Sequence, residues 1–321
     1  MIHFWDRVTA PVIDALRPRT ILQIGAKDEH ATRKLIEAAI RIGATVHVAA
    51  LDPAFDVAAA RRDAGDRLVV HPARGRDVVP LLATPELILI DDDPNWYNVH
   101  GLLTAVERQA RGGNRPFPTV LVTQTGWPYG RRDSYDEPSA IPEHFRQAYE
   151  RAGIVPGSST LSAQHGIFCD RFNAAAENEA QSGVLTALED FLGDRPGLFA
   201  MSHLPMFHGL TLLRPTGGPA EPALQSILSI LALGRSAMAL AVELEAARVA
   251  LEIDGIALRQ ALVQATYRND ALHQALRAEQ SAAPSEEAGE ARAAALAHAL
   301  LRRLRRAAAA RLRNLATTGA S

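Results

Sequence analysis

The sequence predicts an α/β protein with a doubly wound, mostly parallel sheet, followed by a helical C-terminal region. Short apolar runs alternate with helical patterns over the first two-thirds of the chain. These runs are continuously apolar, which is typical of parallel strands covered by helices on both faces. From about residue 222 onward, apolar residues recur at helical spacing instead.

Five strands separated by helices are expected in the first part of the chain. The expected strands are 20–24, 46–51, 67–70, 86–90 and 119–122, and the expected helices are 30–42, 55–64 and 96–111. Two later apolar runs, 198–203 and 207–213, are separated by only three residues. A parallel crossover needs about a dozen residues, so an antiparallel hairpin at the sheet edge is predicted.

The predicted domain organisation has four parts. They are a sheet domain over 1–218, a helical appendage over 219–280, a linker over 281–290, and an Arg/Ala-rich basic helix or tail over 291–321. The appendage, weakly interrupted at Gly234 and Asp254–Gly255, is interpreted as an element for homo-oligomerisation or for binding a partner protein, or alternatively as a lid. The seven arginines of the final part suit peripheral contact with an anionic membrane surface, or a solvated tail.

Composition excludes several classes of protein. The 321 residues carry 34 basic and 36 acidic side chains, a formal charge of −2, so no nucleic-acid partner is expected. The single cysteine excludes an internal disulfide and a cysteine-built metal site. No signal peptide and no apolar run of about 18 residues is visible, so a cytoplasmic protein is expected.

Three residues are candidate cofactor contacts because each stands at the end of a predicted strand. Gly25 follows the first strand, where the missing Cβ would let a cofactor approach the backbone. Asp52 follows the second strand and could accept hydrogen bonds from ribose hydroxyls, and Asp91 follows the fourth. The carboxyl ends of parallel strands face one crevice. The spacing also allows Gly25 to pack against a helix and both acids to cap helices.

Two segments resemble a known family. Residues 89–99 read Leu-Ile-Asp-Asp-Asp-Pro-Asn-Trp-Tyr-Asn-Val, and residues 126–135 read Gly-Trp-Pro-Tyr-Gly-Arg-Arg-Asp-Ser-Tyr. The first is similar to a segment of class I S-adenosylmethionine-dependent methyltransferases. The second resembles a bacterial methyltransferase-domain family related to the cephalosporin-hydroxylase-like and macrolide sugar O-methyltransferase group. The resemblance spans about two-thirds of the chain and implies a Rossmann-like methyltransferase sheet.

The resemblance also implies a cofactor, a reaction and site residues. The cofactor would be S-adenosylmethionine, bound by Gly25, Asp52 and Asp91, and the reaction would be O-methylation of a saccharide or glycosylated metabolite. Asp91 and Asp93 are candidate catalytic residues and candidate ligands of a divalent cation such as Mg²⁺, which prefers carboxylate oxygens. His208 is a candidate catalytic base.

Four residues of the second segment are candidate acceptor contacts. Trp127 and Tyr129 could stack on a sugar or an adenine ring. Arg131 and Arg132 could hold a phosphate or carboxylate in a bidentate manner. Alternatively, the aromatic rings plug this loop onto the sheet and the arginines form internal ion pairs.

The sequence departs from the family pattern at four positions. Gln23 replaces the usual acid of the first loop and Glu29 its second glycine; Pro94 replaces a histidine, and Gln124 an aspartate that helps hold a cation in related enzymes. These departures motivate a second hypothesis, a catalytically degenerate binding or scaffold subunit with a methyltransferase fold. A third alternative, a metal-dependent hydroxylase-like enzyme, lacks a complete ligand set.

Overall fold

The computed structural model describes residues 1–163, 165–232, 234–282 and 293–306. The chain divides into two units, Met1–Asp254 and Gly255–Ser321. The first unit contains the sheet and is described first.

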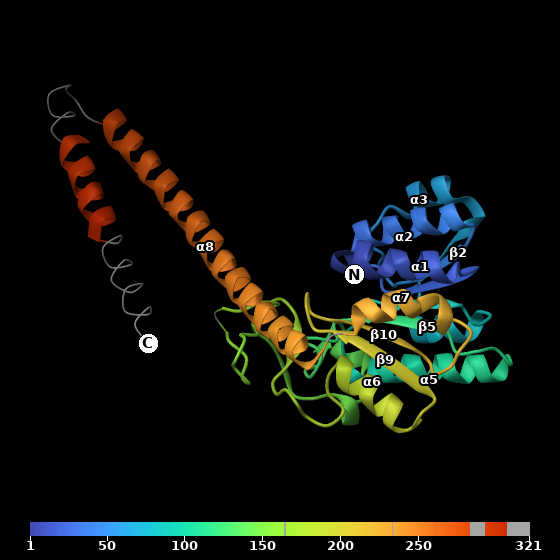
Figure 1. Cartoon of the computed structure of the whole chain (residues 1–321). Coiled ribbons are helices and arrows are strands. Elements are labelled where there is room, and N and C mark those ends of the chain that lie inside the picture. The colour runs from blue at the N-terminus through green and yellow to red at the C-terminus, as the bar shows by residue number, and fades with distance from the viewer. Residues whose placement is uncertain (164, 233, 283–292, 307–321) are drawn as a thin grey trace. The chain divides into compact units, whose positions relative to one another are not determined.

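A seven-stranded sheet forms the centre of the first unit (Figure 1). Its strands are β1 (Thr20–Ile24), β2 (Thr45–Ala49), β3 (Leu68–His71), β4 (Leu87–Ile90), β5 (Thr119–Thr123), β9 (Phe199–Leu204) and β10 (Leu210–Pro215). Their spatial order is β3-β2-β1-β4-β5-β10-β9. Strands β1 to β5 pair in parallel, whereas β10 is antiparallel to both β5 and β9. The predicted doubly wound sheet with an antiparallel edge hairpin is confirmed.

Helices cover both faces of this sheet and give the unit three layers. The helices are α1 (Ala10–Leu16), α2 (Glu29–Ile42), α3 (Val57–Ala64), α4 (Gly75–Val78), α5 (Trp96–Gly112), α6 (Val184–Gly193), α7 (Glu221–Leu231) and α8 (Arg235–Ala282). Helices α1, α2, α3 and α7 pack against one face, and α4, α5 and α6 against the other (Figure 1). The crossovers that follow β1 and β2 lie on one face and those that follow β3 and β4 lie on the other, so a crevice opens where the strand order reverses, between β1 and β4.

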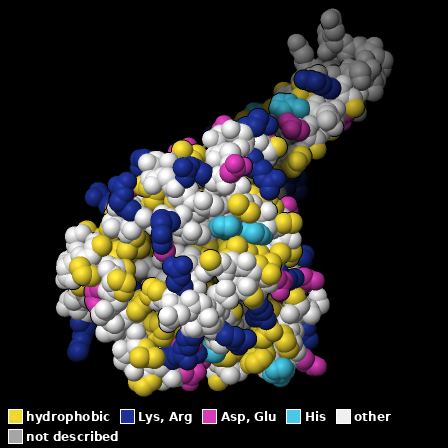
Figure 2. Space-filling model, turned by 90° about the vertical axis from the view of Figure 1, so that its right-hand side faces the viewer, with side chains coloured by type: hydrophobic (Ala, Val, Ile, Leu, Met, Phe, Trp, Pro, Cys, Tyr) yellow, Lys and Arg dark blue, Asp and Glu magenta, His cyan; other side chains and the backbone are white. Residues whose placement is uncertain are grey.

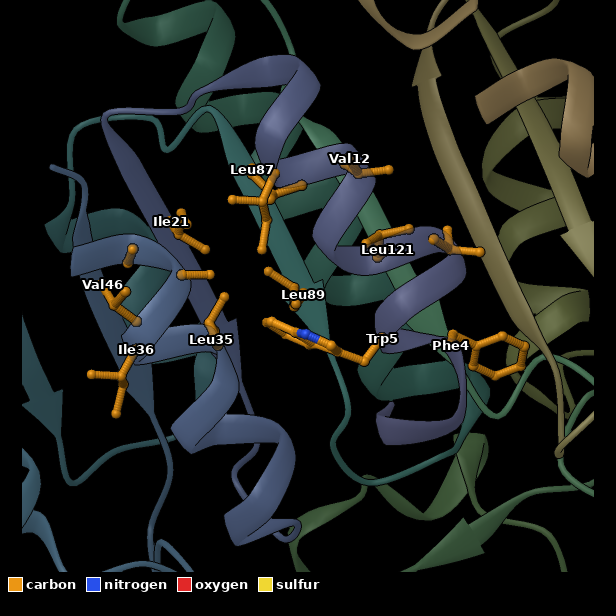
Figure 3. Close-up of a cluster of buried hydrophobic side chains, with 14 of the residues drawn as sticks. Phe4, Trp5, Val12, Ile21, Leu35, Ile36, Val46, Leu87, Leu89 and Leu121 are labelled. Carbon is orange, nitrogen blue, oxygen red and sulfur yellow. The ribbon is translucent and has the colours of Figure 1, made fainter. Parts of the chain in front are cut away.

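The core on the first face includes an N-terminal segment that was not predicted. Trp5 belongs to a π-helical turn over Trp5–Thr9, and its ring lies beside Leu35 of α2 and Leu89 of β4 (Figure 3). Val12 of α1 is fully buried in the same cluster. Burying one such side chain stabilises a fold by about 1.5–3 kcal/mol, so this segment is an integral part of the domain.

The surface of the molecule carries charges of both signs. Figure 2 shows basic and acidic side chains interspersed with hydrophobic ones on one face. Typical surface pairs are Arg33–Glu29, at 2.9 Å, and Arg41–Asp14, at 2.8 Å. Exposed pairs of this kind contribute about 0–1 kcal/mol each, so the buried contacts decide the stability of the fold.

The first unit extends beyond the predicted boundary at residue 218. Leu224, Ile227 and Leu231 of α7 are buried against the sheet domain, and Val249 of α8 is fully buried. These apolar side chains recur on one helical face and attach the first part of the helical region to the sheet domain. The helices after residue 219 are therefore divided between the two units. The first unit therefore includes the beginning of the region predicted as an appendage over 219–280.

The second unit contributes the distal part of α8 and a helical stretch over 293–306. The helix is not interrupted at Asp254–Gly255, in contrast to the prediction, whereas a break near Gly234 is present. Of the predicted linker and basic tail, residues 283–292 and 307–321 lie outside the described residues. In the part of the chain that is described, no single helix has both the length and the apolar character of a membrane span, although α7 and α8 meet those criteria jointly across a 66° bend.

A long segment between β5 and α6 adds a small second sheet at the carboxyl ends of the main strands. Its strands are β6 (Ser134–Tyr135), β7 (Tyr149–Arg151) and β8 (Phe172–Ala174), in the antiparallel order β6-β8-β7. Strands of two or three residues leave too short a pattern for the sequence to predict.

The buried carboxylate of Asp133 ties this segment to two helices. One carboxylate oxygen accepts hydrogen bonds from the backbone N–H of Trp96, at 2.8 Å, and of Gly183, at 2.7 Å. The hydroxyl of Tyr135 donates to the other oxygen, at 3.1 Å. Trp96 begins α5 and Gly183 precedes α6, so one anion satisfies the N-terminal ends of both helices, where negative charge is favourable. Burial nevertheless raises the pKa of Asp133 to about 6.

We expect Asp133→Ala to lower the free energy of unfolding by about 4 kcal/mol, because two buried N–H groups lose their acceptor and each unsatisfied group costs about 1–3 kcal/mol. Asp133→Asn keeps one oxygen for both N–H groups and should cost about half as much. Urea unfolding followed by circular dichroism measures both values. Equal losses in the two variants would contradict this role of the carboxylate oxygen.

The stability of the fold should also depend on pH through Asp133. Its pKa in the folded protein lies above that of the unfolded chain, so the folded state holds the proton more tightly. The free energy of unfolding of the native protein, relative to that of Asp133→Asn, should therefore fall by up to about 3 kcal/mol as pH rises from about 4 to about 6, and then level off. A relative stability that rises over this range would contradict the raised pKa.

Candidate functional site

A cavity of about 380 Å³ opens at the carboxyl ends of β1, β2 and β4. It lies at the point where the strand order reverses, which is the usual ligand position in doubly wound sheets. Its volume falls within the range of small-molecule sites. The residues that line it are Gly25, Ala26, Lys27, Ala49, Ala50, Leu51, Asp52, Ala73, Arg74, Arg76, Asp77, Asp92, Asp93, Tyr97, Asn98, Asp136, Glu137, Ala140 and Ile141.

Gly25 lines the cavity, but the conformation and packing of the backbone alone already require a glycine here. Its φ of +80° lies in the left-handed region that favours glycine. A Cβ at this position would overlap the carbonyl oxygen of Asp91, because the ends of β1 and β4 approach closely. Gly25 is therefore required by the contact between the ends of β1 and β4, and not by packing against a helix as the alternative expected. The close approach brings both strand ends to the cavity wall.

Asp52 lies at the rim of the cavity and is exposed to solvent. The adjacent helix α3 is capped by Asp56, whose side chain accepts from the N–H of Ala59 at 2.9 Å. Because another residue caps that helix, the Asp52 carboxylate is free to serve a ligand.

Glu29 points away from the cavity. It pairs with Arg33, one turn later in α2, at 2.9 Å, and half of its side chain is exposed. Asp28 provides the helix cap by accepting from the N–H of Ala31 at 3.1 Å. A glutamate in place of the family's second glycine therefore adds no negative charge to the cavity.

Two adjacent acids, Asp92 and Asp93, form part of the cavity wall. Burial raises the pKa of Asp92, and burial together with the nearby Asp136 raises the pKa of Asp93 to about 7. One oxygen of Asp93 accepts from the backbone N–H of Asp136 at 2.9 Å. The carboxyl of Asp93 therefore exchanges its proton near neutral pH at a position that borders the cavity.

A short strap over residues 136–141 closes one side of the cavity. Two ion pairs attach it to the loops of the main sheet, Lys27 with Asp136 and Arg74 with Glu137. Ala140 and Ile141 supply its apolar contribution to the lining. The strap follows β6 directly, so the Asp133 contacts also position it.

The opposite wall comes from α4 and the start of α5. The guanidinium of Arg76 lies 4.1 Å from the centre of the Tyr97 ring and donates to the Tyr97 carbonyl at 3.1 Å. The Asn98 amide donates to the backbone oxygen of Asp93 at 3.1 Å. Six acids and three basic residues line the whole cavity, so its charge favours a ligand with positive groups.

Asp91 is not among the described residues that line the cavity. One of its oxygens accepts from the Thr123 hydroxyl at 2.6 Å, and the other lies 3.5 Å from the α-amino group of Met1. The helix that follows, α5, is capped by Asn95, which accepts from the N–H of Asn98 at 2.8 Å, and not by Asp91 as the alternative expected. Asp91 therefore connects β4 to β5 and to the N-terminal segment.

The predicted metal site finds no support in this arrangement. The Asp91 carboxylate is engaged by Thr123 and Met1, whereas Asp93 faces the strap and accepts from Asp136. Within the described residues, no group of three His, Cys, Asp or Glu side chains could hold a metal ion. The residues present do not fit a divalent cation, and we assign no step to one.

The four candidate acceptor contacts of the 126–135 segment lie outside the cavity lining. Tyr129 is fully buried and donates to the Asn173 side chain at 2.9 Å. Arg132 is also fully buried and donates to the backbone oxygens of Ala174 and Ser159.

The remaining two have protein partners as well. Arg131 forms a two-pronged ion pair with Glu189 of α6, 2.8 Å at one contact. Trp127 is half-buried, and its backbone carbonyl oxygen accepts a hydrogen bond from the ring of His208. The internal ion pairs that were the alternative for the arginines are thus present, because a loop buried this deeply must satisfy its polar groups internally.

His208 is likewise occupied within the protein. Its Nδ1 lies 3.1 Å from the Trp127 carbonyl oxygen, and its backbone N–H donates to Glu245 at 2.9 Å. Burial lowers the pKa of His208, so its ring is neutral at neutral pH and Nδ1 donates to the carbonyl. The placement of His208, away from the cavity lining, does not suit the predicted base.

Several cavity residues were not predicted from the sequence. Three of them are basic residues in loops or short turns, Lys27, Arg74 and Arg76. In the sequence they cannot be told from ordinary charged residues of the surface. Asp136 and Glu137 follow the quoted motif directly, but only the tertiary fold brings them beside Lys27 and Arg74. The signal that could have found Asp92 and Asn98 was present, since both belong to the 89–99 segment.

No protein-family profile matches the sequence, and no curated protein matches it. Three similar solved structures are a Podospora anserina methyltransferase bound to S-adenosylhomocysteine, a Burkholderia thailandensis 1,6-didemethyltoxoflavin N1-methyltransferase and human N-acetylserotonin methyltransferase. Their identities to this chain are 18%, 15% and 13%, with TM-scores of 0.39, 0.34 and 0.34. The alignments cover 64%, 66% and 64% of this chain and 76%, 80% and 50% of theirs. Similarity at this level is weak, and the fold assignment rests on the chain's own strand order.

Gly25→Ala should destabilise the protein by about 2–5 kcal/mol, because a left-handed conformation costs about 1–2 kcal/mol and the overlap with Asp91 adds about 1–3 kcal/mol. Gly43→Ala is a matched control. Its φ of +78° is nearly the same, but only the tip of the Arg67 side chain, at 3.8 Å, lies near the added methyl group. Thermal unfolding of both variants measures the difference, and equal losses would show that the two strand ends are not in contact.

Proposed function

We propose that this protein is an S-adenosylmethionine-dependent methyltransferase. The observation that carries the proposal is the cavity at the switch point of a doubly wound sheet, with Gly25 at its base, Asp52 at its rim and an excess of acids in its lining. The resemblance of residues 89–99 and 126–135 to methyltransferase segments supports the same cofactor.

The residues present fit this cofactor. Asp52 would accept hydrogen bonds from the ribose hydroxyls, and the backbone near Gly25 and Ala26 would lie along the methionine part. The acids Asp92 and Asp93 would offset the positive charges of the ammonium and sulfonium groups. S-adenosylmethionine supplies an electrophilic methyl group on a positively charged sulfur.

The chain's own residues would position the acceptor and take its proton. Asp93 borders the cavity and has a pKa of about 7, so its carboxylate can accept a proton from an acceptor hydroxyl at neutral pH. The strap over 136–141 would exclude water from this position and orient the acceptor. We propose a saccharide or a glycosylated metabolite as the acceptor, supported by the sugar O-methyltransferases among the families that the 126–135 segment resembles.

A second candidate is a binding or scaffold subunit that has lost catalysis. The observation that favours it is Gln23, which stands where the family carries an acid. Its amide donates to the Thr32 hydroxyl at 2.8 Å, and its carbonyl oxygen is buried without a partner among the described residues. Such a subunit would fold normally and bind no cofactor, or bind it without turnover.

Calorimetric titration with S-adenosylhomocysteine tests the proposed cofactor. We expect saturable binding by the native protein and about a tenfold loss of affinity in Asp52→Asn, since two ribose hydrogen bonds to a charged acceptor weaken by roughly 1.4 kcal/mol in total. Glu29→Gln is the matched control, because this acid faces solvent and should leave affinity unchanged.

Two further outcomes separate the candidates. No heat at millimolar ligand, from a protein whose thermal unfolding is cooperative, would overturn the proposal and favour the scaffold subunit. Binding without methyl transfer from labelled S-adenosylmethionine to any of a panel of sugars and glycosides would retain the cofactor and reject the saccharide acceptor.

A further inference from the structure

The distal part of α8 carries an apolar stripe. Leu258, Leu262, Ala265, Asn269, Leu272 and Leu276 follow one another at spacings of four, three, four, three and four residues. This spacing averages 3.5 residues and keeps all six positions on one narrow face of the helix. It is the a/d pattern of a coiled coil, with a at 262, 269 and 276 and d at 258, 265 and 272.

The described residues leave three leucines of this stripe exposed to solvent, whereas Leu276 is half-buried. Leu258 is 66% exposed, Leu262 is 67% exposed and Leu272 is 42% exposed. Three large leucines on one face of a helix that begins at Arg235 and continues without interruption to Ala282 expose far more apolar surface than isolated side chains do (Figure 1). Upstream, Leu244 and Leu251 continue the seven-residue spacing of the d positions and are also exposed.

We propose that this stripe is a dimerisation surface, on which a second copy of the chain forms a parallel, two-stranded coiled coil. A seven-residue repeat selects another helix as the occupant, because only a helix with the same repeat keeps its own seam in contact along the whole length. Asn269 at an a position selects two parallel strands in register, since its amide then meets the same amide of the second copy.

Charges beside the seam support the same arrangement. In parallel coiled coils, each g residue faces the e residue five positions later in the other helix. Here Asp254 occupies g and Arg259 occupies e, so each copy would offer its Asp254 to the other copy's Arg259. Neither side chain has an ion-pair partner among the described residues, and Arg259 bonds only its own helix, to the Gly255 carbonyl at 3.2 Å.

Two exposed side chains of the same helix provide matched controls. Val263 is 53% exposed and Tyr267 is 73% exposed, but they occupy the b and f positions, outside the seam. Shortening them removes similar apolar surface from α8 without touching the proposed interface.

Sedimentation velocity of the full-length chain tests the proposal. We expect a mass of two chains of 34.6 kDa for the native protein. Leu258→Ala with Leu262→Ala should weaken association at least a hundredfold and give monomers at micromolar concentration, whereas Val263→Ala with Tyr267→Ala should leave the dimer intact. A monomeric native protein would overturn the proposal, as would a control pair that dissociates as readily as the seam pair.

Charge exchange tests the parallel orientation. Asp254→Arg or Arg259→Asp alone should weaken the dimer several-fold, and the double variant should restore it. Circular dichroism confirms that each variant keeps its helix content, so a loss of mass cannot be assigned to unfolding. Single variants without effect, or a double variant weaker than both, would exclude the parallel pairing.

Discussion

The fold depends on a single buried anion placed where three segments meet. Asp133 accepts from the N–H groups that begin α5 and precede α6, and from the hydroxyl of Tyr135. Without it, two helix ends would be buried with unsatisfied donors, which costs more than any surface ion pair contributes. The long segment between β5 and α6 has little regular structure of its own. The Asp133 carboxylate therefore attaches this segment to the domain, as hydrogen bonds between strands would do in a regular sheet.

The same constraint shapes the cavity. Residues 134–135 are fixed beside Asp133, and the chain continues directly into the strap that carries Asp136 and Glu137. The strap is held by Lys27 and Arg74, which belong to loops after β1 and β3. The ion pairs of the strap at the cavity therefore depend on the hydrogen-bonded carboxylate of Asp133 in the interior. A change at Asp133 should also change the position of the strap.

The sequence predicted the sheet well and the site only in part. Runs such as 20–24 and 119–122 are recognisable because parallel strands covered on both faces are mostly apolar, although Gln23 and Thr119 are buried polar exceptions. The Trp127–Asp133 motif was also recognisable, but a pattern of residue types does not reveal which way the side chains point. Tyr129 and Arg132 turned out to hold the loop together, and the strap residues gained their position only through the tertiary fold.

The burial of polar side chains limits where in this protein a ligand can be bound. A polar side chain that is fully buried must satisfy its hydrogen bonds within the protein, and is then unavailable to a ligand. Tyr129 meets that condition, and Arg132 directs both terminal nitrogens of its guanidinium to backbone oxygens. Asp91 and His208 are bonded to neighbouring segments. Asp52 and Asp93 differ because each reaches the cavity with bonding capacity to spare. Residues that border the cavity and retain an unused donor or acceptor are therefore the ones on which any reaction of this protein must depend.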